Sequence, residues 1–504
     1  MWRIRKGRCP SADICGAVRS DSPELIDNSL ARSTRGTTIR PETCSGWSGP
    51  VVLAALLMVM ALSYPGDTGF LSDELTLMQM ALDANGLHHL ASHGLLGTYG
   101  IHYGPVPVWF YQAILLCSHH LPTVALIHTV VFFAMTAGGL FWLAAVLKWW
   151  RWFVPIILAG PYFWFYARLP WDNPLAMPIG MAAVAAYASF VSRPAFWKPL
   201  VVVIGIWLLA GVHLMTMPLV LALILCLLGA QWRAMLRWKW WLGGIVVMIV
   251  ICSIPYLLVL HLDFPGQAPG LTNRSDGLML CLQAPRMQSA MSLGSVAGEQ
   301  WMQATGGILQ LPIAVTGIAY LLVWGGASAC LWGILRGHRE QDGSAQQQVL
   351  RLVLLAVALQ MLIFTLRGLP RYLHYNNGMW AAHVALAWWA ADLLVRRYRA
   401  GRWLMGVYAA ALITVTGALA HQLHAYQNGW PVAQSMEIVR AMTNLPADAT
   451  VETGLPDGYI RRPDFDVIAR MMGLGPIHWA ARGQGRYILR TAGATTQRFV
   501  LEPR

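Results

Sequence analysis

The sequence is poor in charged residues, which excludes most soluble folds. Only 12% of its 504 residues are Asp, Glu, Lys or Arg, whereas 56% are hydrophobic and the mean hydropathy is +0.49. So few charges cannot cover the surface of a soluble globular protein of this length. The composition therefore predicts an integral membrane protein.

Two other patterns are absent. The eight cysteines are scattered, with no CxxC pair and no spacing typical of metal ligands, so we interpret them as small buried residues without a disulfide framework. Residues 1–48 are polar and rich in Arg, and they lack the order of basic, apolar and cleavage regions that marks a secretory signal. We expect 1–48 to be a disordered cytoplasmic tail, followed by an uncleaved membrane anchor from Val51 onward.

Long apolar runs fill most of the remaining chain and predict an all-α polytopic fold with about 11 transmembrane helices. The predicted spans are residues 49–65, 122–147, 152–169, 173–192, 198–213, 215–230, 240–262, 308–334, 349–366, 379–396 and 403–424. The net charge of +13 comes largely from short basic connections between these runs. That distribution is typical of cytoplasmic loops and requires no nucleic acid as a partner.

The basic loops also predict an orientation. All of them lie in the cytoplasm if the N-terminus is inside, the C-terminus is outside, and the apolar run 105–118 lies at the outer interface without crossing. The region 49–424 is then the transmembrane module, and its first outer loop, 66–121, carries juxtamembrane helices. Residues 425–504 show helical patterns at 432–443 and 465–472 and strand patterns at 450–452, 485–490 and 497–502. They predict a small extracytoplasmic α/β domain.

The most informative stretch, Phe70-Leu71-Ser72-Asp73-Glu74-Leu75, directly follows the first span. Taken alone, it is typical of a helix start, with Ser72 as the cap and both carboxylates favoured by the helix dipole. Adjacent carboxylates at the end of a membrane helix also indicate a site, because they need water, a cation or a substrate nearby. The predicted orientation places further candidate site residues on the same side: His102, Tyr103, Arg168, Asp172, His213, Arg371 and Tyr372.

These features occur together in one enzyme superfamily. The Asp73-Glu74 pair, the Tyr103-Gly104-Pro105-Val106-Pro107 run, the Arg-x-x-x-Asp turn at 168–172 and Arg371-Tyr372 before a late span resemble the C-type glycosyltransferases that use polyprenyl-phosphate sugars. The nearest branches are the protein O-mannosyltransferases and the lipid A aminoarabinose transferases, and the resemblance covers about 66–400. One departure is clear: the aminoarabinose branch has a basic residue before its Pro-Pro, where this chain has Gly104.

The resemblance implies an inverting transfer of a sugar from a polyprenyl-phosphate donor to a lipid, glycan or protein acceptor. The site would face the outside of a bacterial inner or plasma membrane. Asp73 would be the base, and Glu74 would support it or bind a cation. Arg168 and Arg371 are the expected clamps on the phosphate leaving group, because guanidinium binds phosphate oxygens in a bidentate manner.

The other residues have roles that the sequence leaves open. His102 is a further candidate for the phosphate contact, and Tyr103 and Tyr372 belong to the substrate-binding motifs. Asp172 would lie near the acceptor or a divalent metal ion, for which Glu74 and His213 are candidate ligands; no other cofactor is expected. A salt bridge between Arg168 and Asp172, four residues apart, is an equally good interpretation of that pair.

Two alternative functions remain open. A polymerase or ligase of polyprenyl-linked glycans would share both the donor and the topology. A multi-span transporter would show related halves and charges at mid-membrane depth, but this chain shows no internal repeat and gathers its ionisable residues at one surface. The Asp-Glu pair directly after the first span favours the transferase.

Overall fold

The computed structural model describes residues 46–70, 72–84, 89–97, 101–195, 197–236, 239–262, 274–292, 309–335, 344–426, 431–455, 462–492 and 498–504. The predicted tail 1–48 lies outside the described residues except for its last three positions. The described chain is mostly helical, as predicted.

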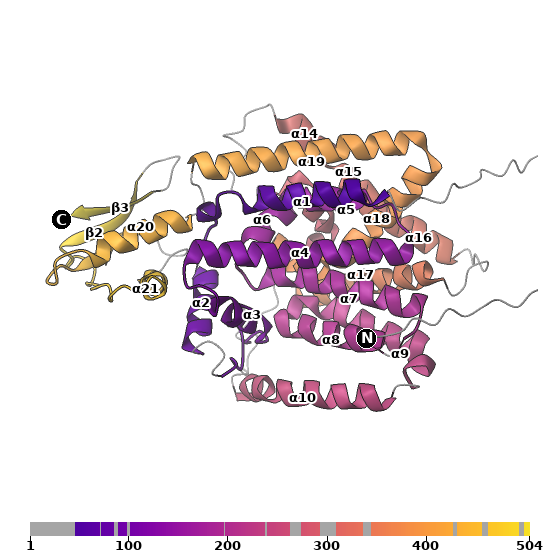
Figure 1. Cartoon of the computed structure of the whole chain (residues 1–504), viewed down its shortest axis with the longest axis horizontal. Helices are drawn as coiled ribbons and strands as arrows, with labels where there is room; N and C mark the ends of the chain where they lie inside the picture. The colour runs from indigo at the N-terminus through magenta and orange to yellow at the C-terminus, as the bar shows by residue number, and fades with distance from the viewer. Residues whose placement is uncertain are drawn as a thin grey trace, which may run out of the picture. The chain divides into compact units, whose positions relative to one another are not determined.

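Most of the long helices run roughly parallel to one another, as Figure 1 shows for α1, α4, α10 and α19. The α-helices are α1 (Ser48–Leu62), α2 (Ser72–Asp83), α3 (Val106–Leu115), α4 (Leu121–Leu147), α5 (Phe153–Leu158), α6 (Pro161–Arg168), α7 (Ala176–Ser192), α8 (Trp197–Val212), α9 (Met217–Leu236), α10 (Lys239–Leu262), α11 (Arg274–Leu282), α14 (Gln310–Val315), α15 (Ile318–Tyr320), α16 (Gly326–Leu335), α17 (Ala345–Arg367), α18 (Trp380–Arg397), α19 (Arg399–Tyr426), α20 (Val432–Thr443) and α21 (Arg462–Met471). Short 3-10 segments are η2 (Pro65–Asp67), η3 (Asn173–Leu175), η4 (Leu214–Thr216), η5 (Ala284–Gln288), η6 (Ala290–Ser292) and η10 (Leu373–Met379), and η8 (Leu321–Gly325) is a π-helical turn.

Within the described chain, six helices are long and apolar enough to cross a membrane: Leu121–Leu147, Asn173–Ser192, Gln310–Ile334, Ala345–Arg367, Leu373–Arg397 and Arg399–Ala425. Shorter apolar helices occupy Ser48–Leu62, Val106–Leu115, Trp197–Val212, Leu214–Gly229 and Gly243–Val259. The length and apolar composition of these helices identify the protein as an integral membrane protein. The count of eleven spans and their orientation stay predictions.

The predicted span 152–169 is not one continuous helix. Gly160 has an extended backbone, with φ −63° and ψ 131°, and separates α5 from α6. Pro161 follows at the first position of α6. A proline cannot donate the backbone hydrogen bond that would continue a helix, and it drives the preceding residue to an extended conformation. The Gly-Pro pair therefore ends α5 and starts a new helix toward Arg168.

The run predicted at 105–118 to lie at the outer interface forms α3. With ten residues, α3 is about 15 Å long, half the thickness of the hydrocarbon core. That length suits a helix that lies at the interface, and the placement of α3 relative to a membrane stays a prediction.

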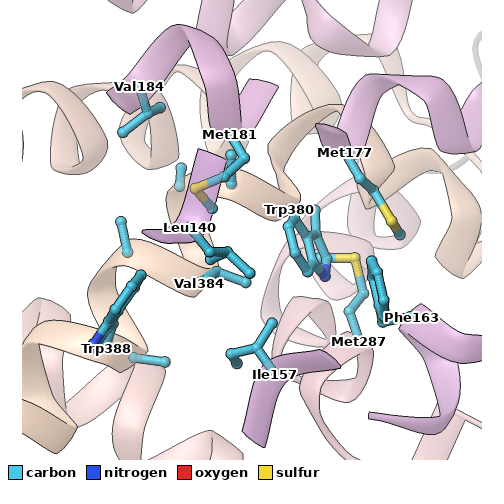
Figure 2. Close-up of a cluster of buried hydrophobic side chains, with 14 of the residues drawn as sticks. Leu140, Ile157, Phe163, Met177, Met181, Val184, Met287, Trp380, Val384 and Trp388 are labelled. Carbon is cyan, nitrogen blue, oxygen red and sulfur yellow. The ribbon is translucent and has the colours of Figure 1, made fainter. Parts of the chain in front are cut away.

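The main core lies among α4, α5, α6, α7, α17 and α18. Bulky side chains fill it, and the rings of Phe163 and Trp380 stack with centroids 5.8 Å apart. Figure 2 shows these rings beside Met177 and Met287, with Leu140 and Val384 close by. These buried residues fix α6 against α18, and α6 is the helix that leads into the turn carrying Asp172.

The C-terminal residues form the predicted helices α20 and α21 and a three-stranded sheet. The strands are β1 (Val451–Thr453), β2 (Tyr487–Ala492) and β3 (Arg498–Pro503), with β2 in the centre, parallel to β1 and antiparallel to β3. Their apolar side chains share one hydrophobic cluster with α2, α3 and the start of α4. The C-terminal elements thus pack directly against the helix that begins with the Asp-Glu pair, and α21 lies beside α2 in Figure 1.

Candidate active site

The Asp-Glu pair lies in the first turn of α2, where the partial positive charge of the helix N-terminus favours carboxylates. The two side chains differ in burial, because Asp73 is exposed whereas Glu74 is 3% exposed. This position agrees with the interpretation of the pair as a helix start. Whether the pair also forms a site depends on the side chains around it.

A third carboxylate lies within electrostatic range of Asp73. Asp172 precedes η3, is 1% exposed, and accepts a hydrogen bond from the backbone N–H of Asn173 at 2.7 Å through Oδ1. Its Oδ2 atom is buried and has no hydrogen-bond partner among the described residues. Burial raises the pKa of Asp172 to about 7, and the negative charge of Asp73 adds to the effect. Two acidic residues far apart in the sequence are therefore electrostatically coupled.

Two tyrosines complete this acidic cluster, which we define as Asp73, Glu74, Asp172, Tyr111 and Tyr166. Tyr111, on α3, and Tyr166, on α6, both interact electrostatically with Glu74, and Tyr111 also interacts with Asp172. The Tyr111 hydroxyl lies 3.0 Å from Nδ1 of His128, a buried residue of α4. The sequence predictions missed these tyrosines; the only available signal was that a buried tyrosine hydroxyl needs a polar partner.

Arg168, expected to clamp a phosphate, holds the backbone between α1 and α2. One guanidinium nitrogen, Nη2, donates to the carbonyl oxygens of Ser63 at 3.2 Å and Tyr64 at 2.8 Å. The guanidinium also lies over the ring of Trp164, 4.4 Å from its centroid. Tyr64 has a positive φ of 53°, which is unfavourable for a residue with a side chain, so these hydrogen bonds stabilise a strained turn.

The alternative salt bridge between Arg168 and Asp172 does not form among the described residues. Arg168 is turned toward the carbonyls of Ser63 and Tyr64, whereas Asp172 faces the backbone of its own turn. The two residues therefore act separately: Arg168 positions the segment that leads into α2, and Asp172 belongs to the acidic cluster.

The His102–Gly104 stretch pairs with the backbone of residues 94 and 95. Gly94 donates to the carbonyl of Tyr103 and Tyr103 donates to that of Leu95, each at 2.8 Å, and Nδ1 of His102 lies 3.1 Å from the carbonyl oxygen of Gly94. Gly104 then lies against α8, where a Cβ atom would be 2.4 Å from the carbonyl oxygen of Gly211. This contact explains why the chain has no basic residue at the position before Pro105, since no side chain fits there.

His213 is buried just before η4, and its Nδ1 accepts the backbone N–H of Met215 at 3.1 Å. The neutral ring therefore carries its proton on Nε2, the nitrogen that would otherwise be available to a metal. Its ring lies 3.8 Å from that of Tyr103. Among the described residues, no group of three or more His, Cys, Asp and Glu side chains could hold a metal ion. The metal roles of Glu74 and His213 stay predictions.

Arg371 and Tyr372 lie at the surface, immediately before η10. Nε of Arg371 pairs with Oδ1 of Asp276 on α11 at 2.6 Å, and the arginine side chain is 53% exposed. Tyr372 is 56% exposed and stacks on His374 with centroids 5.6 Å apart and an interplanar angle of 7°. Arg371 is therefore partly accessible to a ligand, and Asp276 holds it in place.

No protein-family model matches the sequence, and no curated protein matches it. The structure is similar to two crystal structures of ArnT from Cupriavidus metallidurans. The first, bound to undecaprenyl phosphate, has a TM-score of 0.46 and 13% identity, with 88% of this chain and 87% of that chain covered. The second, in the apo state, has a TM-score of 0.42 and 15% identity, with 87% and 86% covered. ArnT is a lipid A aminoarabinose transferase, one of the two branches that the sequence motifs resemble.

Proposed function

We propose that this protein is an inverting glycosyltransferase that moves a sugar from a polyprenyl-phosphate donor to an acceptor hydroxyl on the extracytoplasmic side of the membrane. The donor class follows from the motif resemblance. The observation that carries the proposal is that Asp73, on α2, acts electrostatically on the buried Asp172, on a different segment, and that Tyr111 interacts with both Asp172 and Glu74. A helix cap alone does not require a second buried carboxylate beside it.

The cluster fits the proton movements of such a reaction. The acceptor oxygen attacks the anomeric carbon, the bond from that carbon to the phosphate oxygen breaks, and the polyprenyl phosphate leaves with the bonding electrons. Asp73, exposed in the first turn of α2, takes the proton of the acceptor hydroxyl. Asp172, whose pKa is about 7, holds a proton in part of its population near neutral pH and donates a hydrogen bond to a substrate oxygen through its buried Oδ2.

The leaving phosphate needs positive charge as its own negative charge develops. Arg371 meets this need better than Arg168, because the Arg371 side chain is half exposed whereas Arg168 is buried and hydrogen-bonded to two backbone carbonyls. We assign phosphate binding to Arg371 and positioning of the α1–α2 connection to Arg168. Glu74, buried beside Tyr111 and Tyr166, supports the position of Asp73.

The test is Asp73→Asn in detergent-purified protein, with Asp83→Asn on the same helix as the matched control. The assay measures release of polyprenyl phosphate from polyprenyl-phosphate pentoses and hexoses, with membrane extract as the source of acceptors. An amide cannot accept the acceptor proton, so Asp73→Asn should lose on the order of 10²–10⁴ in rate. Asp83, exposed and paired with Arg470 at 2.6 Å, should tolerate the same change.

Two results would count against the proposal. If Asp73→Asn released polyprenyl phosphate as fast as the wild type, the pair would serve only as a helix start. If transfer depended on Asp73 but the product were a lengthened polyprenyl-linked glycan, the protein would be a polymerase or ligase of such glycans. Parallel reactions with added and chelated divalent metal test the predicted metal dependence.

A further inference from the structure

A continuous row of aromatic rings borders the acidic cluster. Its neighbouring centroids are 3.8 Å apart for Tyr103–His213, 6.4 Å for His213–Tyr375, 4.7 Å for Tyr375–His374, 4.9 Å for His374–Trp171 and 6.3 Å for Trp171–Tyr166. The rings come from the segment before α3, the residue before η4, segment η10, the turn before η3, and helix α6. We call this set the aromatic row.

The aromatic row is not simply part of the core. His213, Tyr375 and Tyr166 are buried, but Tyr103, Trp171 and His374 are only partly buried. Tyr372 extends the row outward, since it lies nearly parallel to His374 and is 56% exposed. Rings that are held on one side and open on the other offer flat apolar faces to a ligand.

Unpartnered polar atoms lie in the same stretch. Nε1 of Trp171, Oδ2 of Asp172 and Oδ1 of Asn173 are all buried and have no hydrogen-bond partner within the described chain. Asp172 and Asn173 are 1% and 2% exposed. Buried polar groups are almost always hydrogen-bonded in native proteins. Three consecutive exceptions, an indole N–H, a carboxyl oxygen and an amide oxygen, therefore indicate a missing polar partner.

A sugar ring has the matching chemistry, because it combines an apolar face of C–H groups with hydroxyls that both donate and accept hydrogen bonds. We propose that Trp171 and the aromatic row form a sugar-binding platform on which Trp171 Nε1, Asp172 Oδ2 and Asn173 Oδ1 bind the hydroxyls. This inference rests on the proposed function. It assigns sugar binding to Trp171, Asn173 and Tyr375, which the sequence analysis did not name as candidates, and places the sugar within electrostatic range of Asp73, whose charge acts on Asp172.

The ring can belong to the donor or to a glycan acceptor, and the test separates the two. Trp171→Phe removes the indole N–H but keeps an aromatic face, whereas Trp171→Leu removes both. Trp403→Phe is the matched control, because Trp403 is 80% exposed on α19. Each variant is measured for the Kd of undecaprenyl phosphate, the Kd of undecaprenyl-phosphate pentose and hexose, and the KM for the acceptor, after its thermal midpoint is checked.

For a donor platform, Trp171→Phe should weaken binding of the sugar-loaded lipid on the order of tenfold. Binding of bare undecaprenyl phosphate should be unchanged. Trp171→Leu should weaken binding of the sugar-loaded lipid further than Trp171→Phe does. For an acceptor platform, both Kd values should stay constant and the acceptor KM should rise by a similar factor. If Trp171→Leu does not fold, Tyr372→Leu, at the exposed end of the row, should show the same selective loss to a smaller extent.

The platform is refuted if the wild type binds the sugar-loaded lipid and transfers its sugar while the folded Trp171 and Tyr372 variants match it in all three measurements. Water alone would then hydrogen-bond to Trp171 Nε1, Asp172 Oδ2 and Asn173 Oδ1. A wild type that binds neither lipid would instead refute the proposed function, and the platform with it.

Discussion

The buried carboxyl group of Asp172 should lower the free energy of unfolding by an amount that depends on pH and can be measured. Its folded-state pKa is raised from 3.8 to about 7, first because of burial. Between these two values the folded protein holds a proton that the unfolded chain releases, so the free energy of unfolding falls as pH rises through this window. Well above pH 7 the carboxylate is charged but still buried, and the free energy of unfolding falls no further. Asp172→Asn removes the charge and keeps the Oδ1 that accepts from Asn173.

The magnitude follows from the same shift. One pKa unit corresponds to about 1.4 kcal/mol, so a rise from 3.8 to about 7 corresponds to a cost of roughly 4 kcal/mol at pH 8. At pH 5 the folded carboxyl is mostly protonated, and the cost is about 1.5 kcal/mol. Asp172→Asn should therefore raise the thermal midpoint relative to the wild type, and the difference should be larger at pH 8 than at pH 5.

The assay is a thermal melt in detergent at one scan rate, from pH 5 to pH 8, with Asp83→Asn as the control. Burial raises the pKa of Asp83, but hydrogen bonds from Arg470 and Gln79 more than offset it and leave the pKa below 3.8. The stability contributed by Asp83 is thus present throughout pH 5–8 and is lost only in stronger acid. Asp83→Asn should therefore lower the thermal midpoint slightly, by the same amount at every pH from 5 to 8. If Asp172→Asn also shifted the midpoint equally at both pH values, or lowered it more at pH 8, Asp172 would not be a buried carboxyl with a raised pKa.

Two further predictions concern the leaving group and the turn before α3. Arg371→Ala should fold and lose on the order of 10²–10³ in transfer rate, with Arg371→Lys only partly active because an ammonium lacks the bidentate fork. Near-normal turnover of Arg371→Ala would show that Arg371 does not bind the leaving phosphate. Gly104→Ala should lower the free energy of unfolding by about 1–3 kcal/mol, because its Cβ would lie 2.4 Å from the Gly211 carbonyl oxygen. A thermal midpoint equal to that of the wild type would show that α3 and α8 can separate without loss.

Local patterns predicted much of the fold. Alternating and helical periodicities located β1, β2, β3, α20 and α21 to within a few residues, because each of these elements buries one face. Apolar runs located the long membrane helices for a different reason, because a membrane-spanning helix is apolar around most of its circumference. The break at Gly160-Pro161 was readable from the two residue types, but a hydropathy window averages over a single glycine and a single proline.

The site was only partly predictable. Ionised groups are conspicuous in apolar sequence, so Asp73, Glu74 and Asp172 could be named as candidates from the sequence alone. Tyr111 and Tyr166 were missed, because an aromatic ring in an apolar helix counts as hydrophobic while its hydroxyl contributes nothing to periodicity. Arg168 was found and given a different role, since its partners are backbone carbonyls that are oriented by the left-handed conformation of Tyr64. No residue-type pattern encodes that conformation.

The position of Asp73 depends on segments from the whole length of the chain. At the start of α2, Arg168 holds the preceding turn, and the backbone N–H of Val432 donates to the carbonyl of Thr68 at 2.9 Å. At the end of α2, the exposed ion pair of Arg470, on α21, with Asp83 at 2.6 Å adds little, because surface ion pairs contribute only about 0–1 kcal/mol. Between these points the apolar face of α2 packs into a cluster shared with α3, α20 and α21. For the proposed role of Asp73 as the base this support matters, because a displacement of about 1 Å can reduce the rate on the order of 10². The C-terminal elements therefore stabilise the geometry of the acidic cluster even though they contribute no residue to it.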